Sequence, residues 1–187
     1  QFNQLTHDRL DTPMEPYPVK KEERPSAELG NRGLLFAGIG WYTRLEFPYL
    51  NNIMEQGEYV HIEKAGLKIY PEYGTYSDFN ALPDSIFLYI ADENNVVTDA
   101  VKDYLGKQVQ GGKLVKDDLF LGNTYYYFDV TQFMKEELGA SGKYKHNLQL
   151  VFNSDDYTKT LKNLTFSAPN GQNPIILQLN YKIYESY

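Results

Sequence analysis

The sequence IILQLNYKI, at residues 175–183, is the strongest strand signal in the chain and the best guide to its fold. Apolar side chains occupy every second position from 175 to 183, and polar side chains stand at 178, 180 and 182. Successive side chains of a strand point to opposite faces, so a period of two predicts a strand with one face on a core.

Other stretches with strand character lie upstream of this one, at residues 39–47, 60–70, 85–91 and 147–153. In the second of these, the apolar positions change parity between Ile62 and Ala65, which predicts a β-bulge near Glu63-Lys64. Residues 85–91 are apolar at both parities and therefore predict a central strand, covered on both faces.

Shorter patterns complete the expected set of elements. Residues 125–130 and 164–167 predict short strands, and residues 114–121 predict an edge strand. Helical spacing predicts a helix over 130–139 with Asp129 as its cap, and a second short helix over 98–105. Residues 51–57 read as a turn or helical loop, and residues 153–159 as a polar loop.

About eight strands separated by turn signals, without regularly alternating long helices, argue against a parallel βαβ sheet. We therefore expect an all-β fold, a two-sheet antiparallel β-sandwich of jelly-roll type with one or two short helices in its connections. Its expected core consists of Trp41, Leu45, Phe47, Leu67, Ile69, Ile86, Leu88, Leu150, Leu177 and Leu179.

Residues 1–30 differ in composition from the rest of the chain, because they hold four of the nine prolines. Proline fixes φ and removes a hydrogen-bond donor, so this segment predicts an extended lead-in or linker, or a strap that packs on the domain. Residues 31–187 form the expected sandwich domain. Because the sequence opens with Gln1, we expect a mature or truncated piece of a longer precursor.

The overall composition excludes several classes of protein. The 187 residues include 18 basic and 25 acidic ones, a net charge of −7 that disfavours binding to nucleic acid. No stretch approaches the ~20 apolar residues of a membrane span. There is no cysteine, which excludes disulfides, thiol nucleophiles and cysteine-ligated zinc.

Several motifs resemble a known family. They are GIG at 38–40 with TRLEFPYL at 43–50, VHIEKAGLKI at 60–69, YFDVT at 127–131, LQL at 148–150 and ILQLNY at 176–181. In this order the motifs resemble a family of Bacteroidota lipoproteins, domain of unknown function 4270. Their skeleton is also similar to jelly-roll modules of secreted polysaccharide-active and surface proteins. The resemblance implies an exported protein of the outer membrane or cell surface, with a lipid anchor upstream, and it implies no reaction.

Candidate contact residues lie in the long loop predicted at 71–83. Tyr73, Tyr76 and Phe79 could stack on sugars or anchor a protein partner. Alternatively, the three rings fold back over the edge of the sandwich. Loops of this length without secondary structure are usually functional or mobile, so we expect this loop to supply part of any ligand site.

No reaction or cofactor follows from the sequence. The histidines His7, His61 and His146 have no metal-site spacing, and we expect them at the surface. Asp92, Asn94 and Asp99 form an oxygen-rich segment that departs from the calcium-loop pattern, so a plain turn is the simpler expectation. Neither a carboxylate pair nor a nucleophile motif stands out.

The expected function is therefore that of a non-catalytic, exported interaction module of the bacterial envelope, acting in adhesion, assembly or scaffolding with a protein partner. A carbohydrate-binding module is the alternative, and a hydrolase whose site the sequence does not reveal is the third.

Overall fold

The computed structural model describes residue 15 and residues 23–55, 59–103, 105–117, 123–139, 146–167 and 173–184. Within them lie a 3-10 helix, η1, three short α-helices and ten strands. In chain order these are η1 (Ser26–Leu29), β1 (Arg32–Phe36), β2 (Thr43–Leu45), α1 (Asn51–Met54), β3 (Tyr59–Ile69), β4 (Ser85–Ala91), β5 (Val97–Ala100), β6 (Gly111–Val115), β7 (Tyr125–Asp129), α2 (Thr131–Gly139), β8 (Asn147–Val151), α3 (Ser154–Lys159), β9 (Asn163–Ser167) and β10 (Ile176–Tyr184).

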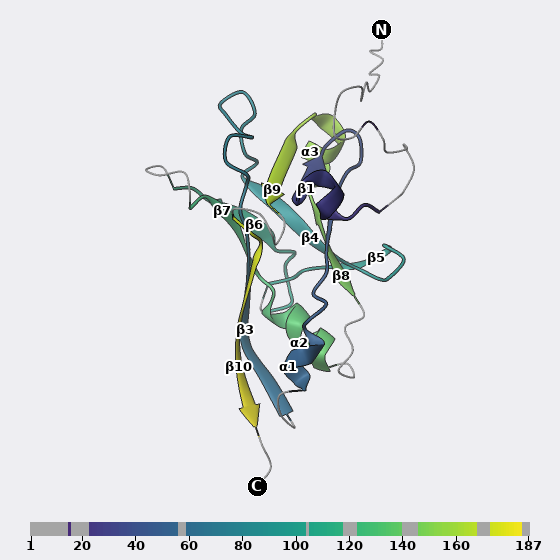
Figure 1. Ribbon diagram of the computed structural model, residues 1–187, viewed down its shortest axis with the longest axis vertical. Coiled ribbons are helices and arrows are strands. Elements are labelled where there is room, and N and C mark those ends of the chain that lie inside the picture. Colours follow the sequence, from purple (N-terminus) through teal and green to yellow (C-terminus); the bar gives the residue numbers. More distant parts are fainter. Residues whose placement is uncertain are drawn as a thin grey trace.

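The strands form two antiparallel sheets, which confirms the prediction of an all-β sandwich with short helices in its connections. The large sheet has the order β10-β3-β7-β6-β4-β8-β2, and β5 pairs with β4. The small sheet pairs β1 with β9. Figure 1 shows β3 and β10 running side by side past helices α1 and α2 towards the C-terminus, while β1 and β9 lie near the opposite end. Strand β4 is central, as predicted, with β6, β5 and β8 as partners.

Strand β3 contains the predicted bulge. Lys64 pairs with Asn180 and Ile62 with Tyr181, so Glu63 has no partner of its own on β10. Both Glu63 and Lys64 are exposed, whereas Ile62 and Ala65 on either side are buried. The extra residue therefore lets apolar residues of opposite parity face one core.

Helix α2 is fixed against β3 at its first residue. The Ala65 amide donates to Thr131 Oγ1 over 2.9 Å, and the Val130 amide donates to the Ala65 carbonyl over 3.0 Å. Asp129 Oδ1 accepts from the Thr131 amide over 3.0 Å, so Asp129 caps the helix as predicted. The buried side of α2 consists of Phe133, Met134, Glu137 and Leu138.

Two sequence predictions about helices are wrong. The described residues of the range 98–105 do not form a helix, since residues 97–100 form β5 beside β4. The β-branched Val97 and Thr98 favour a strand, and pairing with β4 outweighs the weak helical spacing. Residues 153–159 are not a loop, since α3 begins there with Asn153 accepting from the Asp156 amide over 2.7 Å. Two acidic residues in its first turn and Lys159 in its last favour this helix.

Three strand or linker predictions also need correction. Residues 39–47 are not one strand, because Gly38 and Gly40 adopt positive φ (76° and 78°) in a turn, and only residues 43–45 form β2. Strand β6 lies between β4 and β7 rather than at an edge. Residues 26–29 of the expected extended lead-in form η1, which ends at left-handed Gly30. The rest of the lead-in, apart from Glu15 and residues 23–25, lies outside the described residues.

The core differs from the expected one at the sheet edge. Leu45, Leu67, Ile69, Ile86, Leu88 and Leu150 are buried as predicted. Trp41, Phe47, Leu177 and Leu179 are only half-buried. For the two leucines the reason is topological: β10 is the outermost of the described strands, and within them only β3 lies beside it.

The directly paired Leu67 and Leu177 provide a matched test of this arrangement. Leu67 is fully buried, so Leu67→Ala should lower the free energy of unfolding by about 2–5 kcal/mol through lost burial and a cavity. Leu177→Ala should lower it by about 1 kcal/mol or less, because the side chain is already half in water. Urea unfolding of both variants measures the difference, and equal losses would contradict the edge position of β10.

Candidate functional site

The loop between β3 and β4 is tied to the small sheet at its start. Pro71 forms a bridge with Phe166, and the Glu72 amide donates to the Thr165 carbonyl over 2.8 Å. The Arg32 guanidinium donates to both carboxylate oxygens of Glu72, over 2.7 and 2.9 Å. This two-point contact between a guanidinium and a carboxylate fixes the direction in which the loop leaves the domain.

The tip of the loop is closed by its own hydrogen bonds. The Ser77 amide donates to the Asn80 carbonyl and the Asn80 amide to the Ser77 carbonyl, over 3.2 and 3.1 Å. The Asn80 side-chain amide also donates to the Thr75 carbonyl and to Asn163 Oδ1, over 3.0 and 3.2 Å. In Figure 1 the loop extends beyond the sheets at the end opposite the C-terminus. The loop is therefore an ordered projection.

The three predicted contact residues behave differently on this loop. Phe79 is 104% exposed and Tyr73 69% exposed, so these two rings do not fold back over the sandwich. Tyr76 is half-buried, and burial raises the pKa of its hydroxyl, with a further rise from neighbouring Tyr73. The structure thus displays Tyr73 and Phe79 and turns Tyr76 inward, and their role as contacts stays a prediction.

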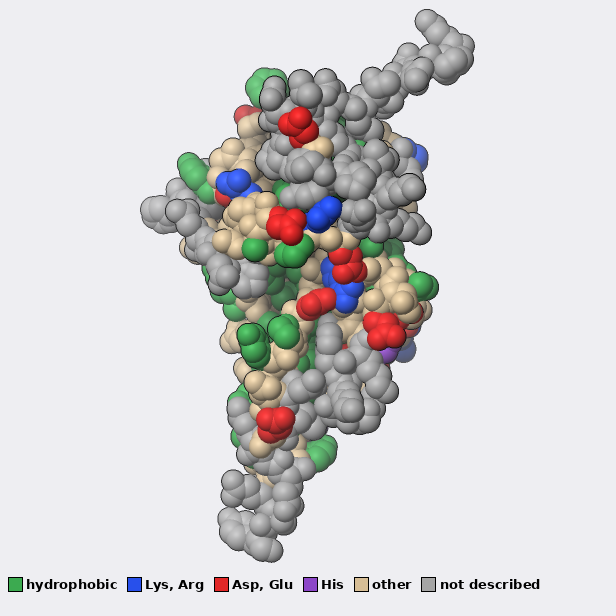
Figure 2. Space-filling view, turned by 45° about the vertical axis from the view of Figure 1, so that its right-hand side comes forward, with side chains coloured by type: hydrophobic (Ala, Val, Ile, Leu, Met, Phe, Trp, Pro, Cys, Tyr) green, Lys and Arg blue, Asp and Glu red, His purple; other side chains and the backbone are tan. Residues whose placement is uncertain are grey.

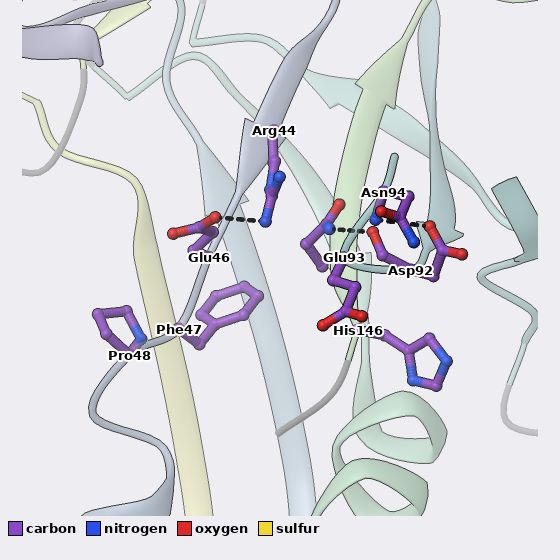
Figure 3. A pocket seen from close by; sticks show the side chains of 9 residues that line it. Arg44, Glu46, Phe47, Pro48, Asp92, Glu93, Asn94 and His146 are labelled. Atoms are coloured by element: carbon purple, nitrogen blue, oxygen red, sulfur yellow. Dashed lines mark hydrogen bonds and ion pairs between the residues drawn. The ribbon is translucent and has the colours of Figure 1, made fainter. Parts of the chain in front are cut away.

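A second candidate site is a depression of about 640 Å³ on another part of the surface. Arg44, Glu46 and Phe47 come from β2 and the chain after it, and residues 92–94 come from the turn between β4 and β5. His146 and Asn147 at the start of β8 complete the lining. Figure 3 shows Phe47 and Pro48 on one side and the 92–94 turn on the other. The sequence singles out Asp92 and Asn94 as an oxygen-rich turn but does not predict the depression, because its three segments meet only through the order β2-β8-β4.

Arg44 lines the depression together with three acidic residues, Glu46, Asp92 and Glu93. Its guanidinium contacts Glu23 over 2.5 Å and Glu46 over 2.7 Å, and donates to Asn95 Oδ1 over 3.1 Å. Figure 2 shows acidic and basic side chains gathered near the middle of one face. The pKa of Glu23 lies below its ordinary value, because the Asn95 amide donates to the carboxylate and Arg44 attracts it, although partial burial opposes the shift. Residue 23, from the expected lead-in, thus packs on the domain.

Two buried polar atoms of this region have no hydrogen-bond partner, namely Arg44 Nε and Asn147 Oδ1. Asn147 is only 2% exposed, and its Nδ2 donates to the Asp92 carbonyl over 2.8 Å, which fixes the orientation of the amide. Buried donors and acceptors are normally satisfied, so these two atoms are exceptions within the described residues.

The residues considered for metal binding are engaged elsewhere. Asp92 Oδ1 accepts from the Asn94 and Val96 amides, over 2.9 and 2.8 Å, and Asp99 pairs with Lys102 over 2.7 Å. His146 Nδ1 lies 2.6 Å from buried Glu137, and His61 is exposed on β3. His7 lies outside the described residues. Across the described ranges, no three or more His, Cys, Asp or Glu side chains gather as a metal site.

The contacts of Glu23 predict how its pKa affects stability and how a change at Asn95 would shift that pKa. A carboxylate whose pKa is lowered by folding stabilises the protein above its unfolded pKa of about 4.3, and this stabilisation is lost as the pH falls through the folded value. Since Asn95 is the largest cause, Asn95→Gly should raise the pKa of Glu23 towards its ordinary value. Glycine keeps the positive φ (62°) of that position.

The pKa of Glu23 can be measured in the parent and in Asn95→Gly by NMR titration of its side-chain carboxyl carbon. Glu28, whose contact with Arg24 does not involve Asn95, is the internal control. An unchanged Glu23 titration in the variant would contradict the Asn95 contact. The associated stability is below about 1 kcal/mol, because the side chain is largely exposed.

Comparison with protein-family models, with curated proteins and with solved structures finds no match for this chain. Among the described residues, none of the helices has the length and apolar character needed to cross a membrane.

Proposed function

We propose that this domain is a non-catalytic interaction module of the bacterial cell envelope, exported and lipid-anchored, and that it binds a protein partner through the loop between β3 and β4. The observation that carries the proposal is the display of Phe79 and Tyr73, at 104% and 69% exposure, on a loop held in place by hydrogen bonds. The envelope location rests on the resemblance of the sequence motifs to outer-membrane lipoproteins.

Two physical arguments favour binding through this loop. Large rings in water leave apolar area unburied, and burying them in a partner's pocket recovers that free energy, so aromatic residues are common binding hot spots. The contacts of Glu72 and Asn80 order the loop before binding, which reduces the conformational entropy lost on association. An acidic loop residue, Asp78, lies beside Phe79 and would form a polar rim around the buried ring.

The carboxylates near the Arg44 depression support a non-catalytic reading. Glu46 is ion-paired with Arg44, and Asp92 accepts two backbone amides of its own turn. These contacts give both carboxylates a structural role as acceptors, whereas a glycosidase needs one carboxylic acid placed to donate a proton to its substrate.

The test is a pull-down from a bacterial envelope extract with the parent and with Tyr73→Ala/Phe79→Ala. The double variant should fold normally, because both rings are exposed, and should lose the proteins that the parent retains. Tyr49→Ala is the matched control, since Tyr49 is 77% exposed but lies outside the loop. If the double variant retained every parent partner, the loop would not be the contact surface.

Carbohydrate binding is the second candidate function, and the Arg44 depression is the observation that favours it. Sugar hydroxyls donate and accept hydrogen bonds, and the exposed Glu93 and Asn94 side chains that line the depression can form such bonds. Phe47 and Pro48 offer apolar surface opposite Glu93 and Asn94, as sugar rings require (Figure 3).

A glycan array distinguishes this function from protein binding. Glu93→Ala/Asn94→Ala removes two exposed lining residues and should abolish any glycan signal of the parent. Val97→Ala, on the same hairpin but outside the depression, should leave that signal intact. Absence of a parent signal, or its persistence in the double variant, would remove the depression as a sugar site.

A further inference from the structure

The face of the large sheet that points away from the core carries a tyrosine between two lysines. On the neighbouring strands β3, β7 and β6 (Figure 1), Lys68 pairs directly with Tyr127, and Tyr127 with Lys113. Leu67 and Phe128, the sequence neighbours of Lys68 and Tyr127, are fully buried, so the row lies on the opposite face. Lys113 is exposed, and the other two side chains are half-buried. The row is therefore accessible from solvent.

The ring of Tyr127 lies along this face instead of standing up from it. The Cβ atom of an alanine at Gly66 on β3 would lie 3.0 Å from both Cε2 and the hydroxyl oxygen of Tyr127. The ring therefore reaches across β3, where the missing side chain leaves room for it. On the same face, Phe87 of β4 lies over Gly111 of β6, with its Cζ 3.5 Å from the corresponding Cβ position. Two aromatic rings are thus laid against the backbone of the sheet.

The two lysines give the row a positive charge that the fold does not neutralise. Within the described ranges, neither Lys68 nor Lys113 forms an ion pair. The Lys68 ammonium lies 5.1 Å from the centre of the Tyr125 ring, which holds it on this face. Asp129, two residues further along β7 than Tyr127, accepts instead from the Thr131 amide at the start of α2. In a chain with a net charge of −7, the row is therefore locally basic.

We propose that the row Lys68-Tyr127-Lys113 binds an acidic polysaccharide, with a sugar ring stacked on Tyr127 and sugar carboxylates paired with the two lysines. The C–H face of a pyranose is apolar and fits an aromatic ring that lies along the sheet. Adjacent strands are about 4.8 Å apart, so the lysines flank the tyrosine closely enough to reach carboxylates on neighbouring sugars of one chain. The site uses no residue of the Phe79 loop or of the Arg44 depression.

Shape and charge favour this occupant over other anionic chains. A peptide docks through pockets for its side chains or through pairing at a sheet edge, whereas this site is the face of a sheet with rings laid on it. Nucleic acid also stacks on aromatic rings, but its binding surfaces are strongly basic, and this chain has 25 acidic and 18 basic residues. A polyuronate combines an apolar ring face with one carboxylate on each sugar, which are the two features that the row complements.

The probes are polygalacturonate and alginate, together with the neutral esters of both polymers. The esters keep the sugar rings and lose the charge. Affinity gel electrophoresis measures retardation of the protein by each polymer, and titration calorimetry measures the dissociation constant. The parent should bind an acidic polymer and should bind its ester about tenfold more weakly, because charged hydrogen bonds are lost. Binding should also weaken as sodium chloride screens the lysines.

Variants test the two parts of the site separately. Lys68→Gln/Lys113→Gln removes both charges and should raise the dissociation constant for the acidic polymer about tenfold or more. Tyr127→Leu removes the ring and should raise it several-fold. Lys107→Gln/Lys135→Gln is the matched control, because it changes the net charge equally at two exposed lysines, one before β6 and one on α2. Circular dichroism and urea unfolding check that each variant is folded.

The proposal is supported if the parent binds, Lys68→Gln/Lys113→Gln loses the binding and the control pair keeps it. It is overturned if neither acidic polymer binds, if the esters bind equally well, or if both lysine pairs have the same effect. Loss of binding in Glu93→Ala/Asn94→Ala would also overturn it, because the polymer would then occupy the Arg44 depression. Tighter binding of oligothymidylate than of either polymer, lost in the same lysine variant, would identify a nucleic-acid surface instead.

Discussion

Strand β3 imposes the constraint on which the rest of the structure depends. In a regular strand, side chains two residues apart lie on the same face. Val60 and Ile62 of β3 follow this rule, and so do Ala65 and Leu67, but the step of three residues from Ile62 to Ala65 breaks it, although all four side chains are buried in one core. The bulge at Glu63, which has no opposite residue on β10, resolves this conflict. The extra residue puts the apolar side chains before and after the bulge on the same face of the strand. Beyond the bulge, β3 is held by β7 on one side and β10 on the other, and α2 is fixed to Ala65.

The surfaces with functional potential follow from this strand. The loop that displays Phe79 leaves from the end of β3 and is braced by Arg32 at the start of β1. The half of β3 before the bulge pairs with β10 alone among the described strands, and the two form the two-stranded arm in Figure 1. Strand β3 therefore positions both the projecting loop and the two-stranded arm.

Sequence-based prediction succeeds where the alternation of apolar and polar residues follows burial directly. It fails where the structure of a segment depends on which strand lies beside it. Residues 85–91 and the bulge at Glu63 follow from side-chain parity alone. Residues 97–100 look helical, because nothing local shows that β4 lies beside them. Alternation in β10 predicts burial of Leu177, but its place at the sheet edge is a property of the whole topology. For the same reason, the depression around Arg44 could not be predicted from the sequence. The 71–83 loop could be predicted as a long loop with three rings, but the sequence left open whether those rings are exposed.

The role of the bulge is tested most directly by deleting Glu63. Without it, Val60, Ile62, Ala65 and Leu67 fall into strict alternation, so we expect a folded protein with the same apolar face and a free energy of unfolding within about 1 kcal/mol of the parent. Deleting Gly66 instead keeps the chain length equal but turns Lys64 towards the core, where an unpaired charge is strongly destabilising. A Glu63 deletion as damaging as the Gly66 deletion, measured by urea unfolding of both, would contradict the account.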